Sequence, residues 1–187
     1  MAFLRIALAF LFCSYICNAS LWPFSPDKMR TYFRDKYGAT NPIPSSLANF
    51  GNPPYGTTMV GRVFYYKQDH LEDPDDANHL YGCERIKPID WTDDPDRINS
   101  PILMIDRGKC TFVQKVRHAQ DIGASAVIIA DNQDEDIANI VMSDDGTGDN
   151  LYIPSIIITK EDANVIKRYI DDPSTRRHVA MTIHFDM

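Results

Sequence analysis

The sequence has few cysteines and no long apolar segment after its first nineteen residues. Four cysteines occur in 187 residues, and Cys13 and Cys17 lie in that first segment. The other two, Cys83 and Cys110, are too few for a disulfide-rich scaffold and too far apart for a C-x-x-C motif. No later run approaches the roughly 20 apolar residues of a membrane-spanning helix, so we expect no transmembrane segment there.

The motifs of common hydrolases are also missing. Neither G-x-S-x-G nor H-E-x-x-H occurs, and the string D-G-T-G at residues 145–148 has its glycine in the wrong place for an aspartic protease. The five histidines show no metal-ligand spacing, and the acidic clusters lack the D-x-D-x-D-G order of an EF-hand loop. We therefore predict no catalytic residue, no cofactor and no metal site, and weak calcium binding by the acidic loops remains an open alternative.

An excess of positive charge is absent as well. The chain has 19 basic and 26 acidic side chains, a formal charge of −7. Nucleic acid, which requires basic surfaces, is therefore not an expected partner.

The first nineteen residues have the pattern of a secretory signal peptide. Arg5 precedes an apolar stretch at residues 6–17, and small side chains follow at Asn18 and Ala19. We predict cleavage after Ala19, which leaves a formal charge of −8 from 18 basic and 26 acidic side chains. The mature chain is then expected in the lumen of the secretory or vacuolar pathway, or outside the cell.

Two cysteines that remain in an oxidising compartment most often pair with each other. We therefore predict a disulfide between Cys83 and Cys110. Two free, buried thiols are the alternative.

The mature chain is predicted to have two parts, a proline-rich wrap at residues 20–56 and a domain at residues 57–187. Six prolines in the first part disfavour long helices and predict an irregular path, apart from one short helix at 26–37. Ser25 is its expected cap, with Pro26 at its first position. The β-branched and aromatic run at residues 57–66 predicts a strand.

Residues 102–130 predict two parallel strands joined by a helix. Apolar runs at 102–105 and 126–130 are typical of strands that are buried on both faces. Between them, Thr111 and Gln114 form a T-x-x-Q capping box at the start of a helix that ends at Gly123. A second strand and helix are expected at 153–159 and 160–170, with Thr159 as the helix cap, and a closing strand at 179–185.

In such a βαβ unit, the loops that leave the parallel strands share one edge of the sheet, where α/β folds bind ligands. These loops are residues 106–110 and 131–150. Arg107 and Lys109 add charge to the exposed amides of a helix start, which favours acceptors such as a peptide carboxylate or carbonyl. Gly108 would allow close approach of a ligand backbone. In the alternative interpretation, Arg107 pairs with an acid of residues 131–150 and holds this edge shut.

Three segments resemble the protease-associated (PA) domain: D-R-G-K-C-T-F-V-Q-K at 106–115, A-Q-D-I-G-A-S-A-V-I-I-A-D-N at 119–132, and I-P-S at 153–155. The upstream segment N-F-G-N-P-P-Y-G-T-T-M-V-G, at 49–61, is most similar to the PA domain of vacuolar sorting receptors. The resemblance implies an α/β fold, a β-barrel-like or sandwich mixed sheet flanked by short helices that contains a βαβ unit.

The same resemblance implies a protein- or peptide-binding module without catalytic residues. In sorting receptors, this domain contributes to cargo recognition through its R-G-x-C turn and a loop after the second strand of the βαβ unit. Those positions correspond here to Arg107, Gly108, Lys109 and Cys110, and more loosely to Asn139, Ile140, Val141, Met142, Ser143 and Asp144.

The receptors continue into further luminal modules, a membrane span and a cytosolic tail, whereas this sequence ends at Met187. We therefore expect a chain more similar to stand-alone secreted PA-domain proteins. An accessory subunit that docks on a separate protease or sorting receptor is the alternative function.

Overall fold

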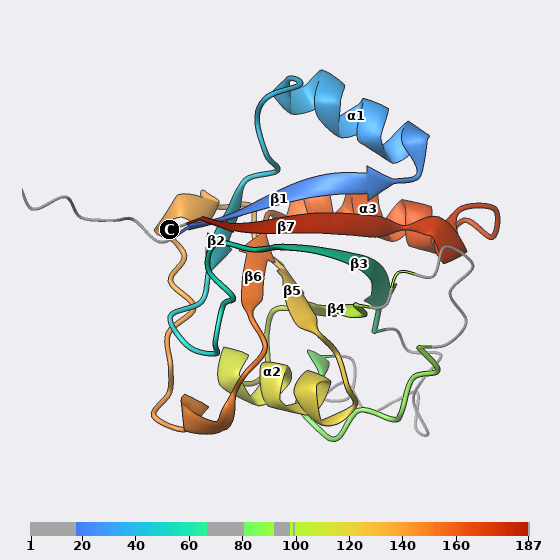
Figure 1. Ribbon diagram of the computed structural model, residues 1–187. Coiled ribbons are helices and arrows are strands. Elements are labelled where there is room, and N and C mark those ends of the chain that lie inside the picture. The colour runs from blue at the N-terminus through green and yellow to red at the C-terminus, as the bar shows by residue number, and fades with distance from the viewer. Residues whose placement is uncertain (1–17, 67–80, 92–97, 99, 187) are drawn as a thin grey trace, which may run out of the picture.

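A seven-stranded sheet organises the computed structural model, which describes residues 18–66, 81–91, 98 and 100–186 (Figure 1). The strand order is β1-β7-β3-β4-β5-β6-β2; β3 to β6 run parallel, and the other pairs are antiparallel. The sheet nearly closes into a barrel, because the Ile43 amide donates to the Leu21 carbonyl of β1 at 2.8 Å. The strands are β1 (Asn18–Ser25), β2 (Ser45–Leu47), β3 (Thr58–Tyr65), β4 (Ile102–Asp106), β5 (Ala126–Ala130), β6 (Ser155–Ile158) and β7 (Ala180–Asp186).

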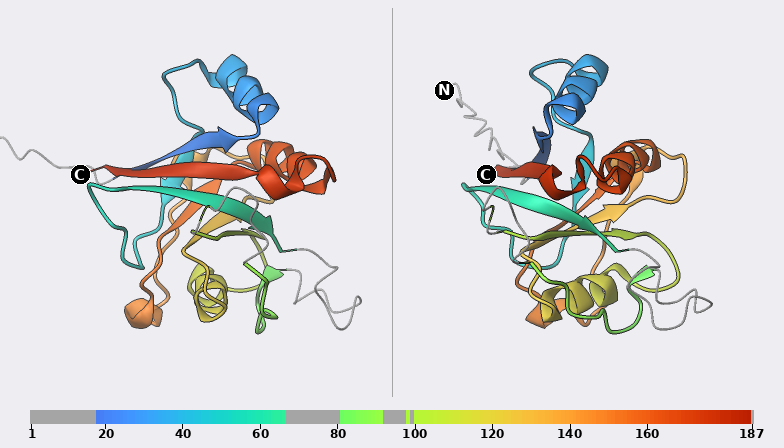
Figure 2. Two further views of the ribbon diagram at one scale, coloured as in Figure 1. Left: turned by 45° about the vertical axis from the view of Figure 1, so that its right-hand side comes forward. Right: turned by 90° about the vertical axis from the view of Figure 1, so that its right-hand side faces the viewer.

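Three α-helices cover this sheet among the described residues: α1 (Asp27–Tyr37), α2 (Phe112–Asp121) and α3 (Lys160–Asp171). The two views of Figure 2 place α2 on one side of the barrel and α1 and α3 on the other. Short 3-10 turns η3 (Ile137–Asn139), η4 (Gly148–Asn150) and η5 (Arg176–His178) complete the described elements. This arrangement confirms the predicted mixed α/β, barrel-like fold and its parallel β4-α2-β5 unit.

The parallel strands are buried on both faces, which explains their continuous apolar sequences. Met104 and Ile128 pack into one core cluster with residues of α1 and α3. Leu103 and Ile129, which alternate with them, pack into a second cluster with residues of α2. Successive side chains of a strand point to opposite faces, so a strand between two helical layers needs apolar residues at every position.

The predicted caps of α2 and α3 are confirmed, with one difference. The hydroxyls of Thr111 and Thr159 accept hydrogen bonds from the amides of Gln114 and Asp162, each at 3.2 Å. The Gln114 side chain, however, does not complete a capping box but donates to the Cys83 carbonyl at 2.6 Å. The disulfide brings Cys83 to the start of α2 and supplies this competing acceptor.

The prediction of an irregular wrap at residues 20–56 is wrong in part, because β1 and β2 are strands of the main sheet. Prolines are tolerated here since β1 has a register irregularity between Pro23 and Ser25. The predicted helix forms, but Ser25 does not cap it: its hydroxyl donates to the His178 carbonyl, and Pro26 occupies the cap position. The division into residues 20–56 and 57–187 stays a prediction.

The predicted signal peptide lies almost wholly outside the described residues, and its cleavage stays a prediction. Asn18 and Ala19, at its expected end, form the first two positions of β1 and pair with Asp186 and Phe185.

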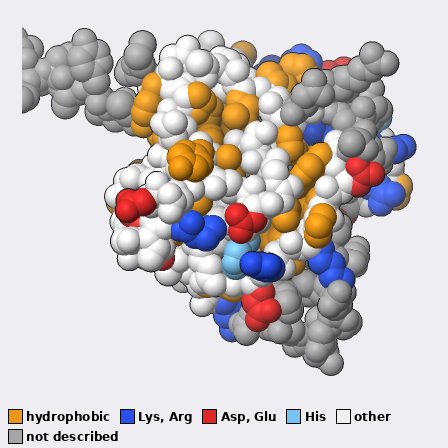
Figure 3. All heavy atoms as spheres, turned by 60° about the horizontal axis from the view of Figure 1, so that its bottom comes forward, with side chains coloured by type: hydrophobic (Ala, Val, Ile, Leu, Met, Phe, Trp, Pro, Cys, Tyr) orange, Lys and Arg blue, Asp and Glu red, His pale blue; other side chains and the backbone are white. Residues whose placement is uncertain are grey.

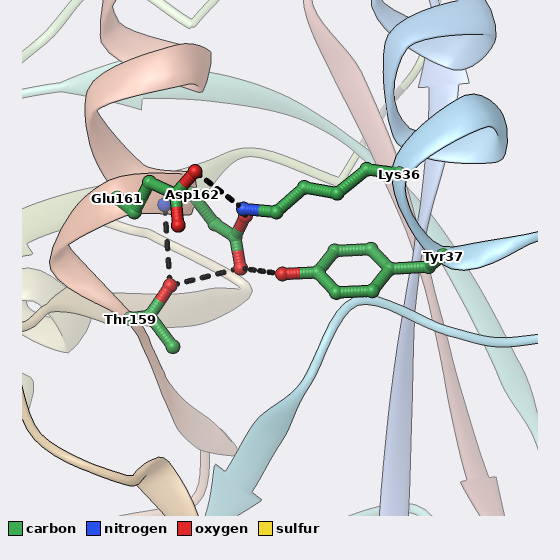
Figure 4. Close-up of polar contacts among 5 residues, drawn as sticks. All are labelled: Lys36, Tyr37, Thr159, Glu161 and Asp162. Atoms are coloured by element: carbon green, nitrogen blue, oxygen red, sulfur yellow. Dashed lines mark hydrogen bonds and ion pairs between the residues drawn. The ribbon is translucent and has the colours of Figure 1, made fainter.

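A buried carboxylate fixes α1 to the rest of the molecule (Figure 4). Asp162, at the start of α3, is fully buried and accepts hydrogen bonds from Lys36, Tyr37 and the Thr159 hydroxyl, each at 2.8 Å. Burial and the Asp162 carboxylate raise the pKa of Tyr37 to about 12. Lys36 also pairs with the exposed Glu161 at 2.9 Å. The ammonium group of α1 therefore contacts two carboxylates at the start of α3.

Candidate functional site

The R-G-K-C turn, residues 107–110, lies at the carboxyl end of β4 and leads directly into α2. The Arg107 amide donates to the Ala130 carbonyl of β5 at 2.8 Å, which fixes the first residue of the turn to the neighbouring strand. Gly108 and Lys109 both have positive φ, +127° and +69°, and reverse the chain. The predicted disulfide then joins Cys110 to Cys83.

The Arg107 side chain pairs with two acids of residues 131–150. Its guanidinium donates to the Asp131 carboxylate at 2.9 Å and to that of Glu135. Partial burial disfavours the Arg107 charge, but these two carboxylates outweigh it and raise its pKa. The predicted alternative, pairing with an acid of this segment, is therefore present in the structure, yet 27% of the Arg107 side chain remains exposed.

Residues 131–150, here called the lid, run from the end of β5 past the start of α2. The Thr111 hydroxyl, and then Thr147, hydrogen-bond to the exposed Asp145 carboxylate and lower its pKa. Farther along, the Arg117 guanidinium donates to the Thr147 carbonyl and the Gln120 amide group to the Asn150 carbonyl at 3.0 Å. The start of the lid therefore lies beside the R-G-K-C turn, as the βαβ topology predicts, and its end lies along α2. Between them, the carbonyls of Ile140 and Met142 accept hydrogen bonds from the Ser46 hydroxyl and the Asn49 amide.

The predicted ligand-contacting residues of the lid divide into exposed and buried positions. Val141 is 67% exposed, and Asn139, Ser143 and Asp144 are exposed as well. Ile140 and Met142, by contrast, are buried among core residues. They anchor the lid to the barrel, so their side chains form no part of the surface that a ligand would meet.

The space beside Gly108 is already filled. A Cβ atom at this position would lie 3.3 Å from Asn132 Nδ2 and 3.3 Å from the Tyr81 ring. The expected close approach of a ligand backbone at Gly108 therefore does not fit this arrangement. The glycine instead allows the turn to pack against its own chain.

Lys115 of α2 supports the turn from below and was not predicted as a functional residue. Its side chain is fully buried, and its ammonium donates to the carbonyls of Gly108 at 2.7 Å and Tyr81 at 2.5 Å. Burial lowers the pKa of Lys115 to about 8, although the charge of Asp106 opposes this shift. The available signal was its helical spacing, because Lys115 lies three residues after Phe112 and four before Ala119, on the face of the helix that packs on the sheet.

We expect the burial of Lys115 to make stability increase with pH. Because its pKa is about 8 when folded and 10.5 when free, the unfolded chain binds more protons between these values. The free energy of unfolding should therefore rise by about 2 kcal/mol between pH 7.5 and 9.5. Urea unfolding of the wild type and of Lys115→Met at both pH values measures this difference.

The variant should lack this rise, and an equal pH dependence in both proteins would contradict the assignment. The measurement stays below pH 10 because tyrosine hydroxyls of the unfolded chain lose their protons near that pH. Burial raises the pKa values of Tyr37 and Tyr65 in the folded protein, so their titration would lower the stability above pH 10.

The surface around α2 carries charges of both signs. Figure 3 views this side of the molecule, where basic, acidic and apolar side chains lie interspersed. Among the described residues, no group of three or more His, Cys, Asp or Glu side chains is arranged to hold a metal ion. No helix in the described part of the chain is long and apolar enough to cross a membrane.

Comparison with known proteins identifies relatives of this chain. Residues 72–166 match the protein family described as the PA domain. Vacuolar-sorting receptor 6 of Arabidopsis thaliana is 30% identical over 164 residues, which cover 85% of this chain and 24% of the receptor. Vacuolar-sorting receptor 7 of the same plant is 38% identical over 120 residues, 62% of this chain and 17% of the receptor.

Among solved structures, a zinc aminopeptidase from Bacillus subtilis superposes with a TM-score of 0.49 and 16% identity, over 90% of this chain and 33% of the enzyme. This chain therefore spans about a quarter or less of the plant receptors and a third of the enzyme that it matches.

Proposed function

Because the chain belongs to the PA domain family, we propose that it is a non-catalytic module that binds a peptide or protein ligand at the R-G-K-C turn and the lid. The relatives are named vacuolar-sorting receptors, and a receptor acts by binding a ligand. The disulfide and the predicted signal peptide favour the lumen of the secretory or vacuolar pathway as the place of binding.

The paired but accessible Arg107 is the observation that carries this proposal. The fully buried Asp131 carboxylate holds the guanidinium from the protein side, whereas Glu135 is 36% exposed. A ligand carbonyl or carboxylate can replace Glu135 while Asp131 keeps the guanidinium oriented. Since a partly exposed ion pair contributes only up to about 1 kcal/mol, this exchange has a low cost.

Apolar side chains of the lid, and of the residue after it that contacts Gln120 of α2, extend the proposed contact surface beyond the turn. Val141 in the lid and Tyr152 just after it are 67% and 66% exposed. Only four large apolar side chains are exposed in the part of the chain that the structure describes, and these are two of them. The buried neighbours Ile140 and Met142 hold the lid so that Val141 projects outward. An aromatic or aliphatic residue of a ligand would contact these side chains.

The test measures binding of peptides from luminal proteins, on an array and then in solution, to the wild type and to Arg107→Ala. We expect Arg107→Ala to bind about tenfold more weakly, because a charge-assisted hydrogen bond is lost. Arg168→Ala, an exposed arginine of α3, is the matched control and should bind as the wild type does.

Arg107→Ala also leaves the buried Asp131 without its cation, so a second variant separates binding from folding. Glu135→Gln removes the competing carboxylate but keeps the Arg107–Asp131 pair, and it should bind about fivefold more tightly. Unchanged binding of both variants to every ligand recovered would remove this site from the proposal. An accessory subunit that docks on another protein would then be the remaining interpretation, and light scattering of native material would detect its obligate complex.

A further inference from the structure

A groove between α1 and β1 is distinct from the turn and the lid. Its volume is about 440 Å³, within the range of sites for small ligands. The groove is lined by Trp22 and Pro23 of β1, by one side of α1, and by residues of the segment 38–43. Figure 2 shows α1 raised above the barrel and connected to it through β1 and this segment.

The groove has a buried apolar floor, a short apolar wall and a charged opening. Phe33 and Ile43 are 2% and 1% exposed, and Trp22 is half-buried. Arg30 and Arg34 line the same pocket, and their side chains are 57% and 58% exposed. A ligand in this groove would therefore meet apolar surface at Trp22 and Pro23, which are half-buried, and guanidinium groups at the opening.

The two arginines lie four residues apart, on one face of α1. Arg30 pairs with Asp27 at 3.1 Å and Arg34 with Asp35 at 3.5 Å. Both acids are strongly exposed, at 92% and 68%, so these ion pairs contribute little and can be replaced by a ligand anion.

The walls of the groove are fixed before any ligand binds. Met29 and Phe33 are buried in the core, and Lys36 and Tyr37 bind the buried Asp162 of α3. The Asn41 side chain donates to the Tyr37 carbonyl at 2.8 Å and holds the segment after α1 against the helix. A site that is already formed loses little entropy when a ligand binds.

We infer that this groove binds a carboxylate that is joined to an apolar group. The apolar group would contact Trp22 and Pro23, and the carboxylate would lie between Arg30 and Arg34. The lining contains two cations and one acid, Asp27, in a protein whose formal charge is −7, so the local charge favours an anion. A small carboxylic acid and the last residue of a peptide both have this chemistry.

The experiment titrates the protein with N-acetyl-leucine, with N-acetyl-leucinamide, and with acetyl-Ala-Ala-Leu that ends in a free carboxylate. Calorimetry gives the affinity, and fluorescence reports the environment of Trp22, one of two tryptophans in the sequence. The free acids should bind about tenfold more tightly than the amide, because the amide lacks the charged acceptor. The fluorescence change should be lost in Trp22→Phe.

Three variants separate charge from shape. Arg30→Gln/Arg34→Gln should weaken the binding of the free acids about tenfold or more. Arg168→Gln/Arg176→Gln removes the same charge elsewhere on the protein and should leave this binding unchanged. Ala39→Phe, at the wall of the groove, should block binding while both arginines remain.

Binding of only the small acid or only the tripeptide would identify the source of the ligand and support the inference. Absence of saturable binding, equal affinity for acid and amide, or equal effects of the two arginine pairs would overturn it. Arg107→Ala should leave this binding unchanged, so failure at one site is distinguishable from failure at the other.

Discussion

Removal of the Cys83–Cys110 disulfide is expected to lower the free energy of unfolding by about 3.5 kcal/mol. The bond closes a loop with a sequence separation of 27, and its loss increases the entropy of the unfolded chain. In the folded protein, the bond also holds Cys83 and Tyr81, whose carbonyls accept hydrogen bonds from Gln114 and Lys115 of α2. Urea unfolding of Cys83→Ala/Cys110→Ala and of the wild type measures the loss.

Reduced wild type is the control for this variant, because it lacks the bond but keeps both sulfur atoms. If the loss comes from the open chain, the reduced protein and the double variant should have the same stability within about 0.5 kcal/mol. If the free energy of unfolding fell by less than about 1 kcal/mol in both proteins, residues 81–91 would stay packed against α2 without the disulfide. Amide exchange in the first turn of α2 would then remain slow in the variant.

The substitution Asp162→Ala is expected to lower the free energy of unfolding by about 3 kcal/mol, the second-largest effect among these predictions. The substitution removes an acceptor of three hydrogen bonds, from Lys36, Tyr37 and Thr159, and each contributes about 1 kcal/mol or more when one partner is charged. Removal of one partner of a buried ion pair lowers the free energy of unfolding by a similar amount, because the other charge is left buried and unpaired. Chemical unfolding measures the loss, and limited proteolysis should show earlier cleavage within α1.

Glu161→Gln is the matched control, because it removes the other carboxylate that pairs with Lys36. Glu161 is 69% exposed, so its pair is screened by water, and the substitution should cost no more than about 0.5 kcal/mol. If the two variants lost the same stability, burial of Asp162 would not be the source of its effect.

Most of the fold was predictable from local patterns. The apolar runs of β4 and β5, the caps Thr111 and Thr159, and the stop at Gly123 each depend on residues close together in the sequence. The strands β1 and β2 were not predicted. They form because β7, β6 and residue 43 supply hydrogen-bond partners that lie far away in the chain.

The candidate site was predictable in its place but not in its contacts. The βαβ topology alone brings the R-G-K-C turn beside the lid, and the paired acid of Arg107 was an expected alternative. The burial of Ile140, Met142 and Lys115 could not be predicted, because each depends on how the lid and residues 81–83 pack against α2 and the sheet.

The sequence by itself determined the order of the helices and central strands, the disulfide partners and the edge of the sheet where the turn and lid meet. These features follow from periodicity, capping and the small number of cysteines, all of which are local or countable. Only the tertiary structure decided which side chains are exposed on the lid, that Asp162 secures α1, and that a groove forms beside β1. Burial and cavities arise where distant segments pack together, and such contacts have no signature in one stretch of chain.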